Sequence, residues 1–302
     1  MRQTLLRSLA LGRKHTLVTS RVAVVTVSYG SEEVLEGFFD SLHAASVNPL
    51  LVVVADNKPE AGATVQRQAE SHGARYLPMN RNAGYGGAVN AAIESLPPDV
   101  TWILVSNPDI ELTPGCVDAL VRVGESDPQI GAVGPLVETD GAVYPSARSI
   151  PSLRTGAGHA LFANLWPENP WSRRYHNDSE NPPRERDAGW LSGSCVLVRR
   201  AAFDAVGGFD DKYFMYFEDV DLGYRLSRSG WRNRYAPSAL VRHSGAHSTD
   251  GDSRRMVLVH HQSAYRFMSS KYSGWYLAPV RLAVKIGLSA RAYLVTRVFH
   301  RG

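Results

Sequence analysis

The stretch "RVAVVTVSYGSEEVLEGFFDSLHAA", residues 21–45, decides the fold class of this chain. Its first part, 21–29, is a nearly unbroken run of β-branched and other apolar residues, which is typical of a strand buried on both faces of a parallel sheet. Its second part, 31–45, has apolar residues at helical spacing. A buried strand followed directly by an amphipathic helix predicts the first unit of an α/β domain.

The same alternation of strand and helix patterns continues along the chain. A second buried strand is predicted at 50–57, a short third strand at 74–79 and further strands at 101–110 and 130–137, with helices at 63–73, 83–96 and 114–126. Strands joined through helices predict a parallel sheet with right-handed crossovers. Ligands of such sheets bind at the carboxyl ends of the strands. We therefore expect the functional site at that edge.

Length and composition favour a single large domain, or one domain with an appended segment. The chain has 302 residues, of which 44% are hydrophobic, enough to bury one sizeable core. Its two cysteines, Cys116 and Cys195, are too few for a disulfide framework and lack metal-like spacing, so a reducing cytosolic setting is expected. Residues 145–188 are rich in Pro, Arg and Asn and predict a long irregular excursion.

Basic residues gather at the two ends of the chain. Residues 1–20 hold four Lys and Arg residues, residues 271–302 hold six, and neither end has an acidic residue. The other 23 of the 33 basic residues stand against all 29 acidic ones, so the body has a net charge of −6. A nucleic-acid-binding protein would carry its basic patch on the folded body. Basic ends interleaved with apolar residues favour contact with an anionic membrane surface.

No segment predicts a transmembrane helix. The apolar run at the N-terminus is interrupted by Arg7, and in "YLAPVRLAVKIGLSARAYLVTRVF" (276–299) a charge returns every four to six residues. The C-terminal segment is therefore expected to be an amphipathic helix that lies on the membrane, which predicts a peripheral protein at the cytoplasmic face of the cell membrane. An ordinary helix packed against the domain is the alternative.

Polar side chains follow several predicted strands. In the turn "NPDIE" (107–111), Asp109 and Glu111 are expected on one side of an extended stretch, and hard cations such as Mg²⁺ and Mn²⁺ prefer carboxylate and phosphate oxygens. His243 offers a third metal ligand or a phosphate donor. The alternatives are a solvated turn and a structural histidine. Candidate ligand groups at the other strand ends are Ser28, Tyr29, Asp56, Asn57 and Asn107.

The glycine-rich stretch "NRNAGYGGAVNAA" (80–92) precedes a predicted helix. Glycines in that position can cradle a phosphate. The spacing is G-x-G-G rather than G-x-G-x-x-G, and the motif follows the third predicted strand rather than the first. Both departures disfavour a nicotinamide-dependent oxidoreductase. A flexible turn whose small residues allow close packing is the alternative.

Negative charge lies among aromatic residues in "YFMYFEDVDLGYRL" (213–226). Asp221 and Arg225 are four residues apart on a predicted helix, a spacing that allows an ion pair. Glu218 and Asp219 lie where the aromatic run meets that helix, so at least one can face a partly desolvated cleft, where the pKa of a carboxyl group rises. We expect Asp219 to be a general base, with Glu218 as the alternative.

Taken in order, these motifs resemble the inverting glycosyltransferases of family 2, which have the GT-A fold. The resemblance covers about residues 21–250 and includes the acid that ends the second strand, N-x-G-x-G, the Asp-bearing turn, "GSCVLVRR" (193–200) and "FEDVDLGYR" (217–225). It implies an α/β, Rossmann-like fold with a mostly parallel central sheet flanked by helices. The expected domains are a basic N-terminal extension (1–20), a GT-A glycosyltransferase domain (21–250) and a C-terminal helical, basic, membrane-associating segment (251–302).

Within that family the chain looks most like the actinobacterial rhamnosyltransferases that make the arabinogalactan linker of the cell wall. The stretches 189–226 and "HHQSAYRF" (260–267) carry this closer likeness. It implies a nucleotide-sugar donor, dTDP-L-rhamnose, a polyprenyl-diphosphate-linked N-acetylglucosamine acceptor and a divalent metal, Mg²⁺ or Mn²⁺. Another donor such as UDP-galactofuranose, a non-catalytic nucleotide-sugar-binding protein, and a homo-oligomer remain open.

The resemblance also assigns roles to individual residues. Asp219 matches the catalytic base, paired with Glu218, and Asp109 matches the metal ligand, with Glu111 and His243 as further candidates. The nucleotide-sugar pocket is implied at Ser28, Tyr29, Asp56, Asn57, Asn82, Gly84, Asn90 and Asn107, and the acceptor site at Trp190, Gly193 and Tyr216.

Two departures from the family pattern affect these roles. "NPDIE" has only one Asp of the usual D-x-D, so metal binding by a single Asp or by Asp with Glu stays open. "DNKPEAG" (56–62) replaces the commoner D-N-G-S turn, which leaves the donor contacts after that Asp-Asn pair open.

Overall fold

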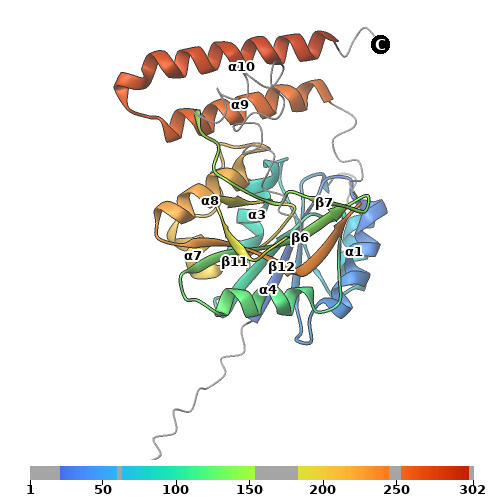
Figure 1. Cartoon of the computed structure of the whole chain (residues 1–302). Coiled ribbons are helices and arrows are strands. Elements are labelled where there is room, and N and C mark those ends of the chain that lie inside the picture. The colour runs from blue at the N-terminus through green and yellow to red at the C-terminus, as the bar shows by residue number, and fades with distance from the viewer. Residues whose placement is uncertain (1–20, 60–62, 154–182, 245–252, 299–302) are drawn as a thin grey trace, which may run out of the picture.

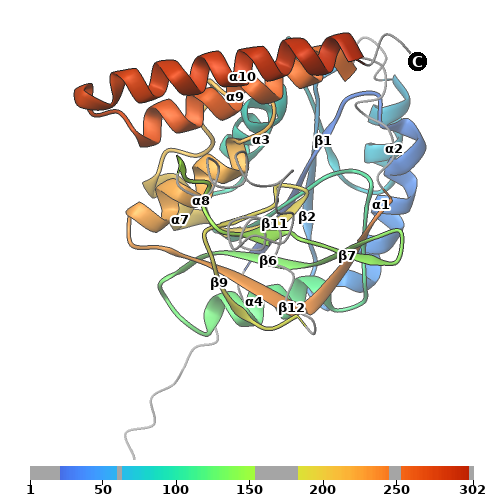
Figure 2. The ribbon, with the colours of Figure 1, turned by 45° about the horizontal axis from the view of Figure 1, so that its top comes forward.

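The computed structural model describes residues 21–59, 63–153, 183–244 and 253–298. One mixed sheet runs through a body with helices on both faces, and two long helices lie side by side along one end of that body (Figures 1 and 2). The expectations for the basic N-terminus and for 154–182 lie outside the described residues, as does the 60–62 part of the "DNKPEAG" turn.

Most of the elements expected from the sequence are present, with ends that differ by a few residues. The strands are β1 (Arg21–Ser28), β2 (Leu51–Asp56), β3 (Arg75–Pro78), β4 (Val100–Ser106), β5 (Ile110–Leu112), β6 (Ile130–Thr139), β7 (Ala142–Tyr144), β8 (Ala147–Arg148), β9 (Arg186–Ala188), β10 (Trp190–Leu191), β11 (Cys195–Arg199) and β12 (Arg232–His243). The helices are α1 (Glu32–Ala45), α2 (Ala63–Ser71), α3 (Gly84–Glu94), α4 (Cys116–Glu125), α7 (Arg200–Ala205), α8 (Glu218–Arg228), α9 (Ser253–Lys271), the 3₁₀ turn η3 (Trp275–Leu277) and α10 (Ala278–Val298).

The main sheet has the strand order β3-β2-β1-β4-β11-β6-β12-β5. From β3 to β4 every pairing is parallel, as the strand–helix alternation predicts. β11 then runs antiparallel to both β4 and β6, and β5 runs antiparallel to β12. Neither β5 nor β11 follows directly from a helical crossover, which is what a parallel strand would need. The expected mostly parallel sheet is confirmed, with antiparallel strands inserted in its second half.

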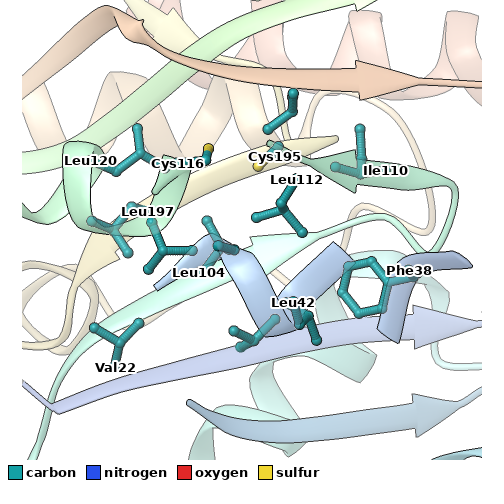
Figure 3. Close-up of a cluster of buried hydrophobic side chains, with 14 of the residues drawn as sticks. Val22, Phe38, Leu42, Leu104, Ile110, Leu112, Cys116, Leu120, Cys195 and Leu197 are labelled. Carbon is teal, nitrogen blue, oxygen red and sulfur yellow. The ribbon is translucent and has the colours of Figure 1, made fainter. Parts of the chain in front are cut away.

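Alternate side chains of the central strands build two cores, one on each face of the sheet. On β1, Val22 and Val24 pack with α1, α2 and α4, whereas Ala23 and Val25 pack with α3, α7 and α8. Figure 3 shows the first core, one cluster that contains Leu104 and Leu197 of the neighbouring strands together with Phe38 of α1 and Leu120 of α4. Cys116 and Cys195 lie in the same core as free thiols, and burial raises the pKa of Cys116 to about 12.

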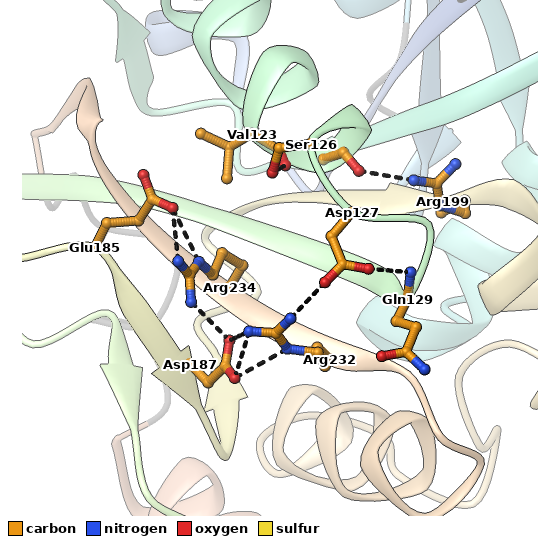
Figure 4. A network of polar contacts seen from close by, with 10 residues as sticks. Val123, Ser126, Asp127, Gln129, Glu185, Asp187, Arg199, Arg232 and Arg234 are labelled. Atoms are coloured by element: carbon orange, nitrogen blue, oxygen red, sulfur yellow. Dashed lines mark hydrogen bonds and ion pairs between the residues drawn. The ribbon is translucent and has the colours of Figure 1, made fainter.

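An arginine network fixes the segment that leads into β10. Arg232 and Arg234, at the start of β12, both donate to Asp187 of β9, and Arg234 also donates to Glu185 at 2.9 Å (Figure 4). Arg232 pairs with Asp127 in the turn before β6. Exposed ion pairs are individually weak, but a network in which each arginine donates several directed hydrogen bonds fixes the path of the chain that it joins. The chain therefore enters β10 and the loop after it from a defined position.

The helices α9 and α10 form a separate pair. α9 contacts the body through buried Phe267, which packs with Tyr213 of the aromatic segment (residues 213–217) and with Val220 of α8. α10 instead leaves Leu282 and Ile286 exposed. None of the described helices is both long enough and apolar enough to cross a membrane.

Candidate functional site

The carboxyl ends of β1 and β2 lie side by side. Ser28 and Asp56 are register partners, and the Asn57 N–H donates to the Ser28 carbonyl at 2.9 Å. The Tyr29 ring is exposed, and the Lys58 ammonium lies 5.7 Å from its centroid. The structure therefore brings Ser28, Tyr29, Asp56 and Asn57 together, as expected. The exposed ring at the rim offers a surface on which a planar group can stack.

Asp56 is fully buried and fixed from two sides. Its Oδ2 accepts a hydrogen bond from the Tyr76 hydroxyl at 2.9 Å and its Oδ1 accepts one from the Lys58 N–H at 3.0 Å. Burial, together with this carboxylate, raises the pKa of Tyr76 to about 12, so the hydroxyl stays a donor. The buried Ser28 Oγ has no hydrogen-bond partner within the described residues. A fixed carboxylate beside an unpaired hydroxyl suits the polar edge of a bound ligand.

Asn57 ties the end of β2 to the start of α3. Its Nδ2 donates to the Gly84 carbonyl at 3.0 Å, and its Oδ1 accepts from the Ala83 N–H at 3.1 Å. The Asn82 Oδ1 accepts from the Gly84 N–H at 3.0 Å. Asn57, Asn82 and Gly84 are therefore gathered in one turn, which their own side-chain amides close.

Gly84 lies against the main chain of the aromatic segment. Its φ is +75°, and a Cβ there would lie 2.1 Å from the Phe214 carbonyl oxygen. That same oxygen accepts a hydrogen bond from the Tyr85 N–H at 3.1 Å. The geometry supports close packing at this glycine, because a side chain at position 84 would not fit. The Tyr85 N–H at the start of α3 is also unavailable to a ligand, since it already donates to the Phe214 carbonyl. A phosphate cradle in this turn stays a prediction.

Asn90 holds α3 to the same neighbouring segment. Its amide nitrogen donates to the Phe209 carbonyl at 2.9 Å and to Asp211 Oδ1 at 2.8 Å, and its oxygen accepts from the Phe209 N–H at 3.0 Å. Both ends of the side chain are thus engaged within the protein. Contact of Asn90 with a nucleotide stays a prediction.

Asp219 is held by the loop between β10 and β11. Its Oδ2 accepts from the Gly193 N–H at 3.0 Å and its Oδ1 from the Val220 N–H at 2.8 Å. The Tyr85 hydroxyl donates to the Gly193 carbonyl at 2.6 Å, which steadies the loop. Burial raises the pKa of Asp219, whereas the two N–H donors and the charge of Arg148 oppose that rise.

Glu218 is the more deeply buried member of the pair. It is 8% exposed, and its Oε2 has no hydrogen-bond partner in the described part of the chain. Burial and the neighbouring Asp219 charge raise the pKa of Glu218 to about 8. A carboxyl group that keeps its proton at neutral pH is a poor base, so Asp219 is better placed to accept a proton.

Asp109 and His243 meet where β5 and β12 pair. The Asp109 Oδ2 lies 3.1 Å from the His243 Nε2, and the Ser244 N–H donates to the Asp109 carbonyl at 3.1 Å. The Asp109 side chain is 10% exposed, and its Oδ1 is buried with no hydrogen-bond partner from the residues described. An unsatisfied buried carboxylate oxygen next to an imidazole has the donor chemistry of a cation site.

Glu111 does not join that pair. Because β5 begins at Ile110, Asp109 belongs to the turn, and the two acids do not follow one extended stretch. The Glu111 side chain is 60% exposed and pairs with Arg242 at 3.3 Å. By distance alone, a different trio in the described part of the chain could share an ion, with ligand atoms within 4.8 Å of one another: Asp40, His43 and His72.

The remaining predicted residues lie around the loop between β10 and β11, which holds Asp219. The Asn107 N–H donates to the Ser194 carbonyl at 2.8 Å, next to Gly193. The Trp190 Nε1 donates to the Ser149 carbonyl at 3.2 Å. Tyr216 precedes the acidic pair, with its ring 5.4 Å from the ring of a histidine on α9. Acceptor contacts of Trp190, Gly193 and Tyr216 stay predictions.

Two residues of this cluster were missed by the sequence reasoning. Burial raises the pKa of Tyr85 well above its usual range, and Glu218, Asp219 and Asp109 add to the shift, so its hydroxyl lies within the field of all three acids. Its position between two glycines of the turn was an available signal. Arg148, which acts on the Asp219 charge, stands in no motif and gave none.

Asp221 has a structural role, as the spacing predicted. It pairs with Arg225 at 2.6 Å, and Arg225 also donates to the Val206 carbonyl at 2.8 Å. The acids of the aromatic stretch therefore divide into a structural ion pair and a buried pair at the site.

Comparisons with known proteins agree with this arrangement. The profile described as "Glycosyltransferase like family 2" matches residues 20–257. The chain is 45% identical to an N-acetylglucosaminyl-diphospho-decaprenol L-rhamnosyltransferase of Mycobacterium tuberculosis, over 93% of this chain and 94% of that protein. It is 26% identical to rhamnosyltransferase WbbL of Escherichia coli, over 83% of this chain and 93% of that protein.

A solved structure supports the fold. A mannosyltransferase of Pyrobaculum calidifontis, determined with GDP-mannose and Mn²⁺, superposes with a TM-score of 0.57 at 17% sequence identity. The match covers 92% of this chain and 76% of that one. It confirms the GT-A architecture that the sequence motifs implied.

Proposed function

The chain belongs to glycosyltransferase family 2, and from this premise we propose that it transfers L-rhamnose from dTDP-L-rhamnose to N-acetylglucosamine carried on a polyprenyl diphosphate. The observation that carries the proposal is the 45% identity to the mycobacterial rhamnosyltransferase over nearly the full length of both proteins. The family match spans 20–257 and so contains both the strand-end cluster and the Glu218–Asp219 pair.

The donor would bind along the carboxyl ends of β1, β2 and β4. The exposed Tyr29 ring offers a stacking surface for thymine, and the Asp56 carboxylate and Ser28 hydroxyl offer acceptors and a donor for the nucleoside. Asn57 fixes the turn at the start of α3.

Asp109 and His243 are the residues that would hold a divalent cation, Mg²⁺ or Mn²⁺. The support is the buried Asp109 Oδ1, which has no partner within the described chain and which a cation would satisfy. The bound ion would offset negative charge on the departing diphosphate. The Ser244 N–H holds the Asp109 carbonyl and so keeps this side chain in place.

Asp219 would take the proton of the acceptor hydroxyl as that oxygen attacks the anomeric carbon of rhamnose. One carbon–oxygen bond forms to the acceptor while the bond to dTDP breaks, so a single displacement inverts the anomeric configuration. The N–H groups of Gly193 and Val220 favour the charged form of this carboxylate, against the effect of burial. Aromatic side chains around the pair would exclude water, which could otherwise hydrolyse the donor.

The enzyme would work at the cytoplasmic face of the membrane, in synthesis of the arabinogalactan linker. The support lies in 253–298, where eight Lys and Arg residues and no acid accompany exposed apolar side chains. Such a surface favours peripheral attachment to anionic lipid, where a polyprenyl acceptor resides.

A direct transfer assay tests the proposal. Purified protein is incubated with Mg²⁺ or Mn²⁺, dTDP-L-rhamnose and a short-chain N-acetylglucosaminyl-diphospho-lipid, and the product is identified by mass and anomeric configuration. A rhamnosylated, inverted product is expected, with UDP-galactofuranose giving none. A product formed only from the galactofuranose donor would refute the rhamnose assignment. Donor binding without any product would identify a non-catalytic nucleotide-sugar-binding protein.

A further inference from the structure

The turn just before the acidic pair has an unusual backbone. Tyr216 and Phe217 have φ angles of +66° and +68°, the left-handed region that residues with large side chains seldom adopt. Phe217 is also the residue from which α8 starts, and its carbonyl accepts the Asp221 N–H at 2.9 Å. Because Glu218 and Asp219 follow directly, this conformation sets the direction in which both carboxylates leave the chain.

Such a conformation persists only where neighbouring structure imposes it. The α8 terminus has no side-chain cap of its own. One side of the segment is held by α3, where the Tyr85 N–H bonds to the Phe214 carbonyl and Gly84 gives the main chain room.

The other side of the segment is held by α9. The Ser263 hydroxyl, which is buried, donates to the Met215 carbonyl at 2.9 Å. The His260 ring lies edge-on against both left-handed residues, 5.4 Å from the Tyr216 ring and 5.5 Å from the Phe217 ring. One turn of α9 thus contacts three consecutive residues of the segment.

We propose that Ser263 and His260 are positioning residues for the transfer reaction. They keep Tyr216 and Phe217 in the left-handed conformation, and through it they aim Asp219 at the acceptor hydroxyl. The reaction named in this inference rests on the proposed function, whereas the contacts of Ser263 and His260 do not depend on it. It also gives the helical pair a second task, because α9 both packs on α10 and supports the turn.

The test compares Ser263→Ala, His260→Ala and the double variant with matched controls from the same helix. Ser269→Ala removes a buried hydroxyl that has no partner within the described residues, and Leu258→Ala removes a side chain of the same helix that is 46% exposed. His260→Phe keeps an edge-on ring and serves as the rescue variant. A soluble short acceptor is used throughout, so that membrane attachment does not enter.

The double variant is expected to lose at least about tenfold in kcat, with the KM for dTDP-L-rhamnose within twofold of the parent. Both controls should match the parent, and His260→Phe should recover most of the His260→Ala loss. Parental kcat in the double variant, or an equal loss in the Ser269→Ala control, would overturn the proposal.

Hydrogen exchange of the 209–221 peptides separates this inference from the proposed function. Exchange should quicken there in the double variant and stay unchanged in the controls. If the parent transfers no rhamnose yet exchange quickens locally, the proposed substrate is wrong and the positioning contacts stand. Unchanged exchange in the double variant would refute them whatever the substrate.

Discussion

The body of the protein and its C-terminal helical pair treat apolar side chains in opposite ways. In the body, Trp102 and Leu104 of β4 are completely buried between sheet and helices. In the helical pair and the turn η3 that joins its helices, Trp275 is 85% exposed and Ile286 is 61% exposed. Apolar surface left open in this way marks an interaction site. The body thus encloses the chemistry, while the pair presents a face to something outside the protein.

The same two regions also differ in the sign of their charged residues. The body places Asp56 and Asp109 at strand ends and holds the buried Glu218–Asp219 pair, whereas 253–298 contains basic residues and no acid. A metal-assisted reaction needs the first pattern, and an anionic lipid surface needs the second. The comparison therefore predicts that changes in the body stop transfer on every acceptor, whereas changes in α10 matter only on membranes.

The largest expected effect is on metal removal. Excess EDTA should reduce transfer to background on both soluble and vesicle-bound acceptor, because the charge on the departing diphosphate is then unopposed. Asp109→Ala should weaken donor binding by roughly 10²-fold when Mg²⁺ or Mn²⁺ is present and leave it unchanged without metal, measured by calorimetry. Full activity in EDTA would break the assignment of metal chemistry to the body.

Replacement of the proposed base comes next. Asp219→Asn should cut kcat by roughly 10²–10⁴, the usual contribution of a positioned base, with donor affinity retained. Asp221→Asn is the matched control, since its carboxylate pairs with Arg225 at 2.6 Å. It should lower the free energy of unfolding by about 1–3 kcal/mol and leave kcat intact. Normal turnover in Asp219→Asn with none in Glu218→Gln would move the role to Glu218.

A smaller, acceptor-dependent effect is expected for α10. The double variant Leu282→Ser with Ile286→Ser should weaken binding to anionic vesicles by about tenfold or more, because exposed apolar side chains lose their lipid contact. Transfer to a soluble acceptor should not change. Val47→Ser, at an exposed apolar residue of the body, is the control and should bind vesicles normally. Vesicle binding that survives both the double variant and high salt would contradict the membrane-facing role of α10.

The smallest effect concerns pH. Burial raises the pKa of Glu218 to about 8 from an ordinary value of 4.5. The folded protein therefore binds the proton more tightly than the unfolded chain, and the wild type loses stability as the pH rises between these values. Glu218→Gln lacks this loss, so its melting temperature should gain on the wild type by roughly 2–8 °C between pH 5 and pH 9. An equal difference at both pH values would contradict a buried, protonated Glu218.

The first half of the fold follows from the sequence because its signals are local. The β-branched runs of β1, β2 and β4 and the helices between them set a parallel arrangement, and the candidate residues at 28–29 and 56–57 meet as predicted. The antiparallel orientation of β11 was not predicted from the sequence. The residue pattern of a strand shows that it is buried, but its neighbours in the sheet depend on residues far away in the sequence.

The site residues divide by the same rule. The Asp221–Arg225 pair was found because both residues lie on one helix. Glu111 was expected beside Asp109 on the assumption that 109–111 is extended, but β5 begins one residue later. Tyr85 and Arg148 reach the acids only after the chain has folded, so their spacing in sequence could not reveal them.

The contact at Gly84 constrains how such a gene can evolve. Residue 84 must remain glycine because the Phe214 peptide occupies the space that a side chain at this position would need. A mutation that adds even a methyl group at position 84 would push on the Phe214 main chain and shift the acids that follow it. Related proteins in which residues 213–217 have changed should therefore still have glycine at position 84, as long as the main chain of residue 214 keeps its place.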